Sequence, residues 1–456
     1  MCGIFGVHGH ADAVKLAQLG LYSLQHRGQE SVGVAVFDDK GGARVVRAMG
    51  TITPDVATEV EQMRGNTAIG HTRYSTAGSS TIENAGPVFV RSRGGHIALA
   101  HNGNLVNADA LRSALEMTGS IFSSTMDSEV IVHRLAKSTA ATPAARVAEA
   151  LTGVEGAFSL IIGFGDTLVA ARDPRGWRPL SMARLNGSVV FASETCAFDI
   201  IGATFEREVA PGEVVSVDAT GVHSTFPFEA KALTRCVFEY VYFARPDSRV
   251  FSGTVDRARR ALGRQLAKEH PAPGADLVFA VPDSSNSAAL GFSEISGLPY
   301  ELALIRNHYV GRTFIQPTQA DRDAKVKVKY NAVREVVAGK SVVMVDDSIV
   351  RGTTTRGLVL LVRSAGAREV HMRVSSPPIT GSCYYGIDTP TRSELIAANM
   401  DLEGIRRHIG VDSLGYLSLD GMLQAVPDGP KGFCHACFSG DYPTPPPSDF
   451  GIGRRS

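Results

Sequence analysis

Cys2 stands directly after the initiator methionine, so that it becomes the amino terminus once Met1 is removed. The thiol then lies beside an α-amino group whose reference pKa is ~7.7–8.0, and this amine can act as an internal base. Gly3 follows and allows a turn that exposes the thiol. This residue therefore offers a nucleophile together with a base, although for Met-Cys-Gly alone a buried structural cysteine is the better interpretation.

Four other segments of the first half carry groups that a nucleophilic cysteine needs. Asn102 and Gly103 join a side-chain amide to a glycine N–H, the two donors of an oxyanion hole. Arg73 is placed to bind a carboxylate. Asp127 stands at the start of a predicted helix, and Arg27 lies in a charged turn before a predicted strand. Each segment also has a purely structural interpretation, such as an N-cap for Asp127 or a tight turn for Asn102-Gly103.

A different chemistry is indicated where Asp346 and Asp347 follow the apolar run Ser341 to Val345. In α/β sheets, ligands bind at the carboxyl ends of the strands. Gly352 and the threonines Thr353, Thr354 and Thr355 then lead into a helix, whose exposed N–H groups suit a phosphate. The alternative is an exposed acidic turn with a threonine cap, which does not explain the apolar strand before the acidic pair. The segment therefore predicts a site for a molecule with ribose hydroxyls and phosphates.

Four of the remaining cysteines form a possible metal site. Cys434 and Cys437 make a C-x-x-C pair near the end of the chain, and Cys236 and Cys383 can join them, whereas Cys196 belongs to the first half. A C-x-x-C pair alone fits a redox pair, half of a zinc site or chance. Four thiolates suit Zn²⁺ and an iron–sulfur cluster equally well.

Composition limits the class of protein that carries these groups. The 456 residues exceed what one core usually supports, so two or three domains are expected. Lys+Arg and Asp+Glu both number 46, which argues against a nucleic-acid partner. No apolar run is long enough to span a bilayer, and the amino terminus does not resemble a signal peptide, so we expect a cytoplasmic protein without a membrane partner. No Walker pattern for a nucleoside triphosphate occurs.

The hydrophobic pattern changes at about Lys231. Before it, short β-type runs such as Ser31 to Phe37 are broken by Gly, Asn and Asp, which predicts an α+β fold with antiparallel sheet. After it, strand-like and helical runs alternate, which predicts a parallel sheet of βαβ units. The predicted strands there are Leu277 to Val281, Ser341 to Val345 and Val370 to Val374, and the predicted helices are Val255 to Lys268, Thr354 to Ala365 and Ser393 to Asn399. We therefore predict domains over 2–230 and 231–442 and a disordered tail over 443–456.

The five motifs of the first half, in this order, resemble the glutaminase domain of the amino-terminal-nucleophile (Ntn) amidotransferases, over about Cys2 to Ala230. The resemblance implies an αββα sandwich in which Cys2 attacks the side-chain amide of glutamine and releases ammonia. It also implies that Asn102 and Gly103 stabilise the oxyanion. The residues implied to bind or support the glutamine are Arg27, Arg73 and Asp127.

The segment around the acidic pair resembles the type I phosphoribosyltransferase signature. This implies an α/β domain in which Asp346 and Asp347 meet the ribose hydroxyls or Mg²⁺, with Ser284 as a further Mg²⁺ contact. The residues implied to hold the 5′-phosphate side of the substrate are Ser348, Arg351, Gly352, Thr353, Thr354 and Thr355. The polar segment Arg312 to Lys329 is implied to be the loop that closes over the substrate.

Both halves together, with Phe238-Glu239-Tyr240 and its neighbours, resemble the glutamine phosphoribosylpyrophosphate amidotransferases over nearly the whole chain. These use ammonia from glutamine to convert phosphoribosyl pyrophosphate to 5-phosphoribosylamine, the first committed step of purine biosynthesis. The resemblance implies homotetramers with purine nucleotides as feedback inhibitors. The cysteines that match the branch with a [4Fe–4S] cluster are Cys236, Cys383, Cys434 and Cys437.

The sequence departs from this family at two points. Gly86 stands where a glutamine is common, in the segment Glu83-Asn84-Ala85-Gly86-Pro87. A short propeptide often precedes the nucleophile in members with the cluster, whereas only Met1 precedes Cys2 here. Two other functions remain open: a glutamine amidotransferase with a different acceptor, and a non-catalytic regulator that binds phosphoribosyl pyrophosphate or nucleotides.

Overall fold

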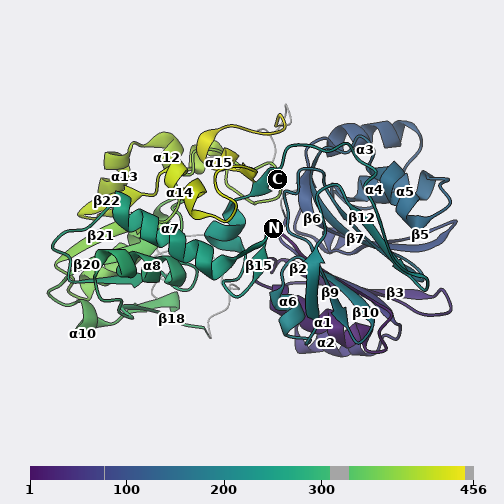
Figure 1. Cartoon of the computed structure of the whole chain (residues 1–456), viewed down its shortest axis with the longest axis horizontal. Helices are drawn as coiled ribbons and strands as arrows, with labels where there is room; N and C mark the ends of the chain where they lie inside the picture. Colours follow the sequence, from purple (N-terminus) through teal and green to yellow (C-terminus); the bar gives the residue numbers. More distant parts are fainter. Residues whose placement is uncertain (76–77, 309–327, 447–456) are drawn as a thin grey trace.

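The protein is described from a computed structural model, which covers residues 1–75, 78–308 and 328–446. Two stacked sheets form one half of the molecule, and a parallel sheet with helices forms the other (Figure 1). The amino terminus lies where the two halves meet (Figure 1). The predicted nucleophile, Cys2, therefore lies next to the second half.

The first half contains two antiparallel sheets. The seven-stranded sheet has the order β11-β9-β10-β1-β4-β2-β3, and the six-stranded sheet has the order β13-β12-β8-β7-β6-β5. The strands of the first sheet are β1 (Gly3–His8), β2 (Ser31–Phe37), β3 (Ala43–Met49), β4 (Thr67–Arg73), β9 (Ser181–Leu185), β10 (Ser188–Ala192) and β11 (Thr204–Glu208). Those of the second are β5 (Val88–Ser92), β6 (Gly95–Leu105), β7 (Gly156–Phe164), β8 (Thr167–Arg172), β12 (Val214–Asp218) and β13 (Gly221–Thr225).

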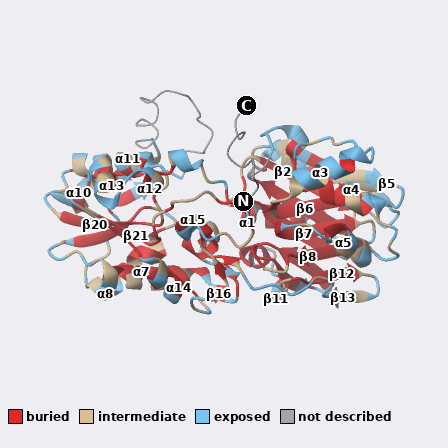
Figure 2. Cartoon of the chain, turned by 90° about the horizontal axis from the view of Figure 1, so that it is seen from above, coloured by how far each residue is buried: buried red, intermediate tan, exposed pale blue. Residues whose placement is uncertain are grey.

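These sheets pack face to face and are covered by helices outside. Ile4 and Ile69 of the first sheet share one buried cluster with Ala100 and Ile161 of the second, because alternate strand residues point to the same face. The helices α1 (Ala13–Leu24), α2 (Pro54–Glu61) and α6 (Cys196–Asp199) pack on the outer face of the seven-stranded sheet. The helices α3 (Ala108–Met117), α4 (Glu129–Lys137) and α5 (Pro143–Leu151) pack beside the other sheet. The predicted αββα sandwich is confirmed, and Figure 2 shows its buried strands in red.

The second half is built on a parallel four-stranded sheet of order β17-β20-β21-β22. Alternate residues of β17 point to opposite faces, so that Val278 packs with α7 and α8 while Phe279 packs with α11 and α13. Both faces are thus buried, which explains the continuous apolar strand sequences. The strands are β17 (Leu277–Ala280), β20 (Ser341–Asp346), β21 (Glu369–Val374) and β22 (Ser413–Tyr416). The helices are α7 (Val255–Glu269), α8 (Asn286–Ser296), α11 (Thr353–Ser364), α12 (Ile396–Asn399) and α13 (Leu402–Ile409). The predicted parallel sheet is confirmed.

Shorter elements connect this sheet to the rest of the molecule. A π-helical turn (Glu239–Phe243) precedes α7. The other short elements are β14 (Arg235–Cys236), β15 (Arg249–Val250), β16 (Gly253–Thr254), β18 (Leu304–Arg306), β19 (Tyr330–Ala332), α10 (Arg334–Val337), α14 (Leu419–Ala425), β23 (Phe433–Cys434) and α15 (Ala436–Ser439). The predicted boundary after residue 230 lies in 226–234, which carries no helix or strand.

Two predicted mobile segments fall largely outside the described residues. Residues 309–327 include nearly all of the polar segment Arg312 to Lys329, and residues 447–456 include most of the tail predicted to be disordered. The start of that tail is held in place: the Tyr385 hydroxyl donates a hydrogen bond to the carbonyl of Thr444 at 2.6 Å and accepts one from its N–H at 3.1 Å. Thr444, the second residue of the predicted tail, is therefore bound to the second half.

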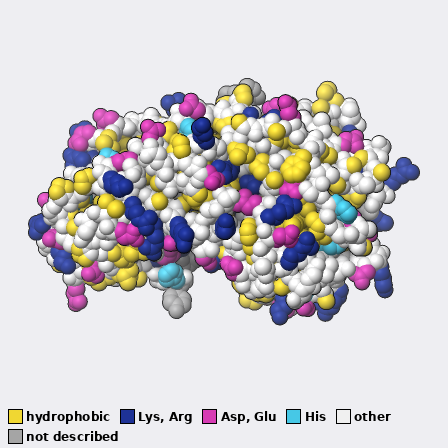
Figure 3. Space-filling view, viewed as in Figure 1, with side chains coloured by type: hydrophobic (Ala, Val, Ile, Leu, Met, Phe, Trp, Pro, Cys, Tyr) yellow, Lys and Arg dark blue, Asp and Glu magenta, His cyan; other side chains and the backbone are white. Residues whose placement is uncertain are grey.

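Among the described residues, the helices are all too short or too polar to cross a membrane. On the face drawn in Figure 3, Lys and Arg side chains alternate with Asp and Glu side chains. This mixed surface is consistent with the equal numbers of acidic and basic residues.

Candidate active sites

The edge where the two sheets meet the second half brings the predicted nucleophile and the predicted oxyanion donor together. Cys2 directly precedes β1, and its N–H donates a hydrogen bond to Oδ1 of Asn102 on β6 at 3.3 Å. The Nδ2 of Asn102 is buried and has no hydrogen-bond partner among the described residues. A buried amide N–H without an acceptor is costly unless a ligand supplies one. The Asn102 side chain is therefore available to a negatively charged oxygen.

Gly103 is required because other backbone segments of the protein approach it closely. A Cβ at this position would lie 2.0 Å from the carbonyl oxygen of Ala157, and φ is 153°. The second half also approaches here, because a Cβ at Gly386 would lie 2.8 Å from the Gly103 carbonyl carbon. In addition, Asn104 Nδ2 donates to the Tyr384 carbonyl at 2.9 Å. The strand β6, which carries the predicted oxyanion donors in the first half, is thus also in contact with the second half.

Arg27 lies behind the nucleophile and does not face open solvent. Its side chain is 0 % exposed, and its Nε donates to the carbonyl of Cys2 at 2.9 Å. The rest of the guanidinium pairs with the carboxylates of Glu194 and Glu239. Sequence reasoning predicted Arg27 near the nucleophile but missed both carboxylates.

Arg73 and Asp127, the residues predicted to hold the glutamine, both have protein partners. Arg73, at the end of β4, forms an ion pair with Glu30, which also accepts the N–H of Ser75 at 2.9 Å. Asp127 accepts the N–H of Leu105 at 2.9 Å, and His101 Nδ1 lies 3.6 Å from its other oxygen. Burial raises the pKa of Asp127, but the charge and hydrogen bond of His101 outweigh it, so that this pKa lies below its usual value.

A second buried histidine lies next to this pair. Burial lowers the pKa of His71 to about 3, and the positive charge of Arg73 lowers it further. For His101, burial also lowers the pKa, but Asp127 outweighs it and raises the pKa above its usual value. Both histidines belong to motifs used in the sequence analysis, where they received no role.

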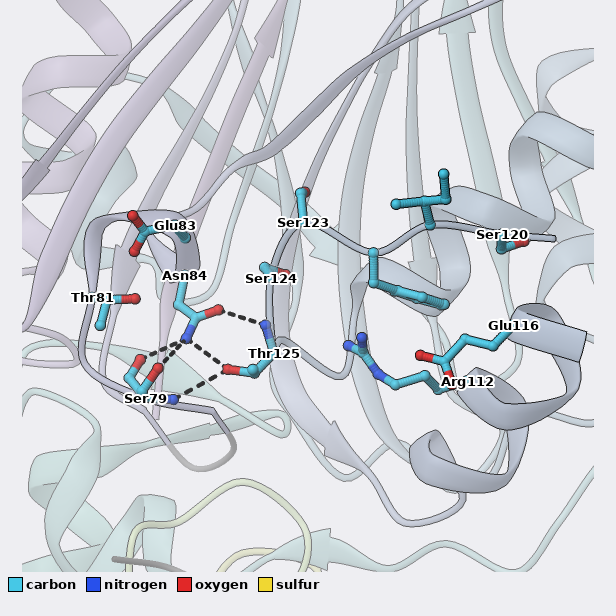
Figure 4. A pocket seen from close by; sticks show the side chains of 12 residues that line it. Ser79, Thr81, Glu83, Asn84, Arg112, Glu116, Ser120, Ser123, Ser124 and Thr125 are labelled. Carbon is cyan, nitrogen blue, oxygen red and sulfur yellow. Dashed lines mark hydrogen bonds between the residues drawn. The ribbon is translucent and has the colours of Figure 1, made fainter. Parts of the chain in front are cut away.

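Asn84 joins the two segments that flank this region. Its Nδ2 donates to the Ser79 carbonyl at 2.7 Å and to Thr125 Oγ1 at 2.8 Å, and its Oδ1 accepts the N–H of Thr125 at 2.9 Å. Figure 4 shows this amide between the two segments. They border an open pocket of about 620 Å³ that also contains Arg112. Asn84 therefore ties residues 79–84 to the segment that leads into Asp127.

The second predicted site lies at the carboxyl ends of β17 and β20. Asp346 ends β20, and Asp347 follows it. The Ser284 hydroxyl, which follows β17, donates to Asp347 at 2.5 Å, and the Ser285 hydroxyl donates to Asp346 at 3.2 Å. Burial and the charge of Asp347 hold the pKa of Asp346 well above its usual value, and burial also raises that of Asp347. Among the described residues, Lys, Arg and His side chains form ion pairs with neither carboxylate.

The predicted phosphate loop follows the acidic pair. Gly352 has φ 75° and precedes α11, whose amino-terminal turn is not capped by a side chain. The cavity here measures about 630 Å³. It is lined by the predicted residues Ser284, Asp346, Asp347, Ser348, Arg351, Gly352, Thr353, Thr354 and Thr355. The structure therefore brings together all the residues predicted for this site, although Arg351 also forms an ion pair with Glu394 at 2.9 Å.

Comparisons with known proteins identify the family. Residues 71–199 match a model described as a glutamine amidotransferase domain. Amidophosphoribosyltransferase 1 of Arabidopsis thaliana is 49 % identical over 98 % of this chain and 79 % of its own length. The amidophosphoribosyltransferase of Bacillus subtilis is 48 % identical over 97 % of this chain and 94 % of its own. The chain belongs to the amidophosphoribosyltransferase family.

A solved structure agrees with this assignment to the family. Glutamine phosphoribosylpyrophosphate amidotransferase from B. subtilis, in complex with ADP and GMP, matches with a TM-score of 0.91 and 46 % identity over 98 % of each chain. The predicted family, its two-part fold and its class as an enzyme of pentosyl transfer are thereby confirmed. These comparisons do not test the roles of the individual site residues, which remain predictions.

The four cysteines implied by the amidophosphoribosyltransferase resemblance lie near one another; Cys236 and Cys383 are buried, and Cys434 and Cys437 are half-buried. Cys236 on β14 and Cys434 on β23 are paired in a two-stranded parallel sheet. Burial raises the pKa of Cys437 well above its usual value, and the nearby thiols of Cys383, Cys236 and Cys434 raise it further. Among the described residues, however, no group of three or more His, Cys, Asp or Glu side chains is placed to hold a metal ion.

Proposed function

We propose that this chain converts phosphoribosyl pyrophosphate, glutamine and water to 5-phosphoribosylamine, glutamate and pyrophosphate, the first step of purine biosynthesis. The observation that carries the proposal is that one chain of this family contains both required sites. Cys2 lies beside an amide that lacks an acceptor, and a buried pair of carboxylates lies beside an uncapped helix start.

At the first site, Cys2 is the nucleophile. Its Sγ attacks the side-chain carbonyl carbon of glutamine, and the negative charge that develops on the oxygen is stabilised by Asn102 and Gly103. When the intermediate collapses, ammonia leaves and a thioester remains, which water hydrolyses to glutamate. The α-amino group of Cys2, free after removal of Met1, transfers the protons. Arg73 and Asp127 hold the α-carboxylate and the α-amino group of glutamine, and Arg27 supports Cys2.

At the second site, ammonia attacks the anomeric carbon of the ribose and pyrophosphate leaves. The amino-terminal turn of α11 binds the 5′-phosphate through its N–H groups and the hydroxyls of Thr353, Thr354 and Thr355. Ser348, Arg351 and Gly352 complete the loop that carries this turn. Asp346 and Asp347 bind the ribose hydroxyls or the metal. Ammonia passes between the sites through the region where the halves meet.

The acidic site fits Mg²⁺. Two buried carboxylates that form no ion pair among the described residues, together with the hydroxyl of Ser284, are oxygen donors of the kind that Mg²⁺ binds. Bound there by Asp346, Asp347 or Ser284, Mg²⁺ would neutralise the charge that develops on the leaving pyrophosphate.

We also propose that Cys236, Cys383, Cys434 and Cys437 hold a [4Fe–4S] cluster. The thiols of Cys236, Cys383 and Cys434 are close enough to raise the pKa of Cys437, and four Cys thiolates are the usual ligands of such a cluster. Cys437→Ser, compared with the matched control Cys196→Ser, is expected to lose the iron, the sulfide and the visible absorption. Stoichiometric zinc without sulfide in the unmodified protein would contradict the cluster.

The proposal also includes feedback inhibition by purine nucleotides and assembly into a homotetramer. The B. subtilis structure contains ADP and GMP, which supports feedback inhibition of this chain by purine nucleotides. The homotetramer and the cytoplasmic location remain predictions from the sequence.

The test is to measure pyrophosphate release from phosphoribosyl pyrophosphate and Mg²⁺, with glutamine or ammonia as the nitrogen source, in protein purified without oxygen. Both sources are expected to support release, and Cys2→Ala is expected to abolish only the glutamine-dependent rate. Release with neither source, in protein with verified iron content and a free Cys2 amino terminus, would contradict the enzyme and favour a regulator that binds the same ligands.

A further inference from the structure

Two carboxylates from different halves of the molecule hold the arginine that contacts the nucleophile. Arg27 donates from Nη1 and Nη2 to the carboxylate of Glu239 at 3.0 and 2.8 Å, and it also pairs with Glu194. All three side chains are 0 % exposed. Because the third donor of this guanidinium binds the Cys2 carbonyl, the position of Cys2 depends on the position of Arg27.

Each of the two carboxylates belongs to one half and binds groups of the other half. Glu194 belongs to the first half, but it accepts the N–H of Arg245 at 2.9 Å and the hydroxyl of Ser248 at 2.7 Å, both from the second half. Glu239 belongs to the second half, and its carboxylate binds Arg27 of the first. A second buried arginine, Arg178, lies 3.5 Å from Glu239. The carboxylate of Glu239 therefore balances charge on the glutaminase side of the interface.

The turn that carries Glu239 is also attached to the transferase pocket. Arg259 on α7 donates to the carbonyls of Tyr240 and Ala244, both at 2.8 Å, and to that of Ser284 at 3.4 Å. Tyr242 and Phe243 of the same turn line the cavity that contains Asp346 and Asp347. The turn that carries Glu239 is thus held by Arg259, which also contacts Ser284 of the second site, while the Glu239 side chain reaches the first site.

We propose that Glu239, from the transferase half of the chain, is a positioning residue for Cys2 and that it acts through Arg27. This inference rests on the proposed function only in that Cys2 is taken as the nucleophile. A buried guanidinium that loses one carboxylate must move toward another acceptor or water. Its Nε then no longer holds the Cys2 carbonyl in place, and the thiol moves relative to Asn102. Small misplacements of a reacting group lower the rate strongly.

The test compares Glu239→Gln with the matched control Glu213→Gln. Glu213 is also a buried carboxylate paired with an arginine, Arg207, at 2.8 Å, but this pair involves none of the active-site residues. In Glu239→Gln, the kcat of the glutamine-dependent reaction is expected to fall by about 10- to 100-fold, as for a misplaced reactive group. The KM for glutamine and the ammonia-dependent rate are expected to stay within about threefold of those of the unmodified protein. The control variant is expected to retain both rates.

A second measurement does not depend on the reaction. The rate at which iodoacetamide alkylates Cys2, followed by mass spectrometry in protein without Met1, is expected to change in Glu239→Gln and to be nearly restored in Glu239→Asp, which keeps the charge. A double-mutant cycle with Arg27→Lys is expected to be non-additive, because both residues act on Cys2 by one contact. If Glu239→Gln fails to fold, Glu239→Ala, which also removes the carboxylate, is read in the same way.

Three outcomes would overturn the inference. Glutamine-dependent rates within about twofold of the unmodified protein would show that Cys2 does not need Glu239. An equal loss with glutamine and with ammonia would place Glu239 in the support of the transferase site. An unchanged rate of Cys2 alkylation would separate Glu239 from the nucleophile. Failure of the proposed function itself looks different, because the unmodified protein would then release no pyrophosphate, while the alkylation measurement would still test the role of Glu239.

Discussion

The two sites differ in whether their charged side chains are paired within the protein. Near Cys2, the charged side chains discussed above have partners within the protein: Arg27 with two carboxylates, Arg73 with Glu30, and Asp127 with His101. In the second site, Asp346 and Asp347 lie side by side without an ion pair among the described residues. The first site is therefore organised before its substrate arrives, whereas the second is completed by a cation and a charged substrate.

The difference follows from the ligands that each site is proposed to bind. Glutamine is a neutral zwitterion, and the only charge that develops on it is the oxyanion, for which the unpartnered Nδ2 of Asn102 is reserved. Phosphoribosyl pyrophosphate carries several negative charges and is proposed to bind with Mg²⁺, so buried carboxylates without a cation favour binding of the metal–substrate complex. Changes that remove a charge should consequently have opposite effects on stability in the two sites.

The largest effect is expected for Asp346→Asn. Loss of a metal or ribose ligand should lower pyrophosphate release by about 10³-fold with either nitrogen source, as expected for several kcal/mol of lost charge stabilisation. The same change removes a carboxylate that burial and a neighbouring charge disfavour, so the midpoint of thermal unfolding without Mg²⁺ should rise. Added Mg²⁺ should raise this midpoint in the unmodified protein and not in the variant. A lower midpoint in the variant would contradict the description of this site as incomplete.

Asn102→Ala should have a smaller effect that is limited to one site. Removal of an oxyanion donor costs about 10²–10³-fold in kcat, and here only the glutamine-dependent rate should fall. The Nδ2 of Asn102 has no partner in the described structure, but its Oδ1 accepts the Cys2 N–H at 3.3 Å, so stability should fall by about 1 kcal/mol, the usual contribution of one hydrogen bond. Asn107→Ala, whose Nδ2 donates to the Gly153 carbonyl on the surface, is the matched control. An equal loss of the ammonia-dependent rate would argue that Asn102 supports the fold instead.

The pH dependence of stability should separate the two histidines behind Cys2. Since the pKa of His71 is lowered to about 3 from 6.5, the unfolded chain binds a proton below pH 6.5 that the folded protein does not bind. The contribution of His71 to the free energy of unfolding is therefore lost as the pH falls from 6.5 toward 3, by about 1.4 kcal/mol per pH unit. His101 has a raised pKa, so its contribution is present below pH 6.5 and is lost as the pH rises through its folded pKa.

Thermal unfolding midpoints between about pH 4.5 and 6.5 test the expectation for His71, and midpoints at higher pH, on both sides of the folded pKa of His101, test that for His101. The midpoint of the unmodified protein should fall toward acid pH more steeply than that of His71→Asn. The effect of His101→Asn, by contrast, should be smaller above the folded pKa of His101 than below it. Parallel curves for the unmodified protein and His71→Asn would show that His71 is not buried in its neutral form.

The sequence predicts those parts of this arrangement that depend on neighbouring residues. The strand predicted at Ser31 to Phe37 is β2 with the same bounds, and the helix predicted at Val255 to Lys268 is α7, one residue longer. The acidic pair was predictable because the residues before it form a buried strand. Glu239 was not, because its partner Arg27 lies 212 positions away and no local pattern distinguishes a buried carboxylate from an exposed one. The ion pair between Arg73 and Glu30 was missed for the same reason, since the two residues are 43 positions apart.

The smallest effect is expected at Gly86, where the resemblance described above predicts a glutamine. A Cβ at this position would lie 1.8 Å from His71 Nδ1, so any other residue must displace the imidazole. Gly86→Ala should destabilise the protein by about 1–3 kcal/mol, the usual cost of overpacking, and lower the glutamine-dependent rate several-fold through the disturbed His71 and its neighbour His101. Combination with His71→Ala should remove most of the cost of Gly86→Ala, because the space that the imidazole occupied is then free. Additive losses in the double variant would mean that the backbone at Gly86, and not the ring of His71, excludes a side chain. The glutaminase site would then tolerate no side chain at position 86 whichever residue occupies position 71.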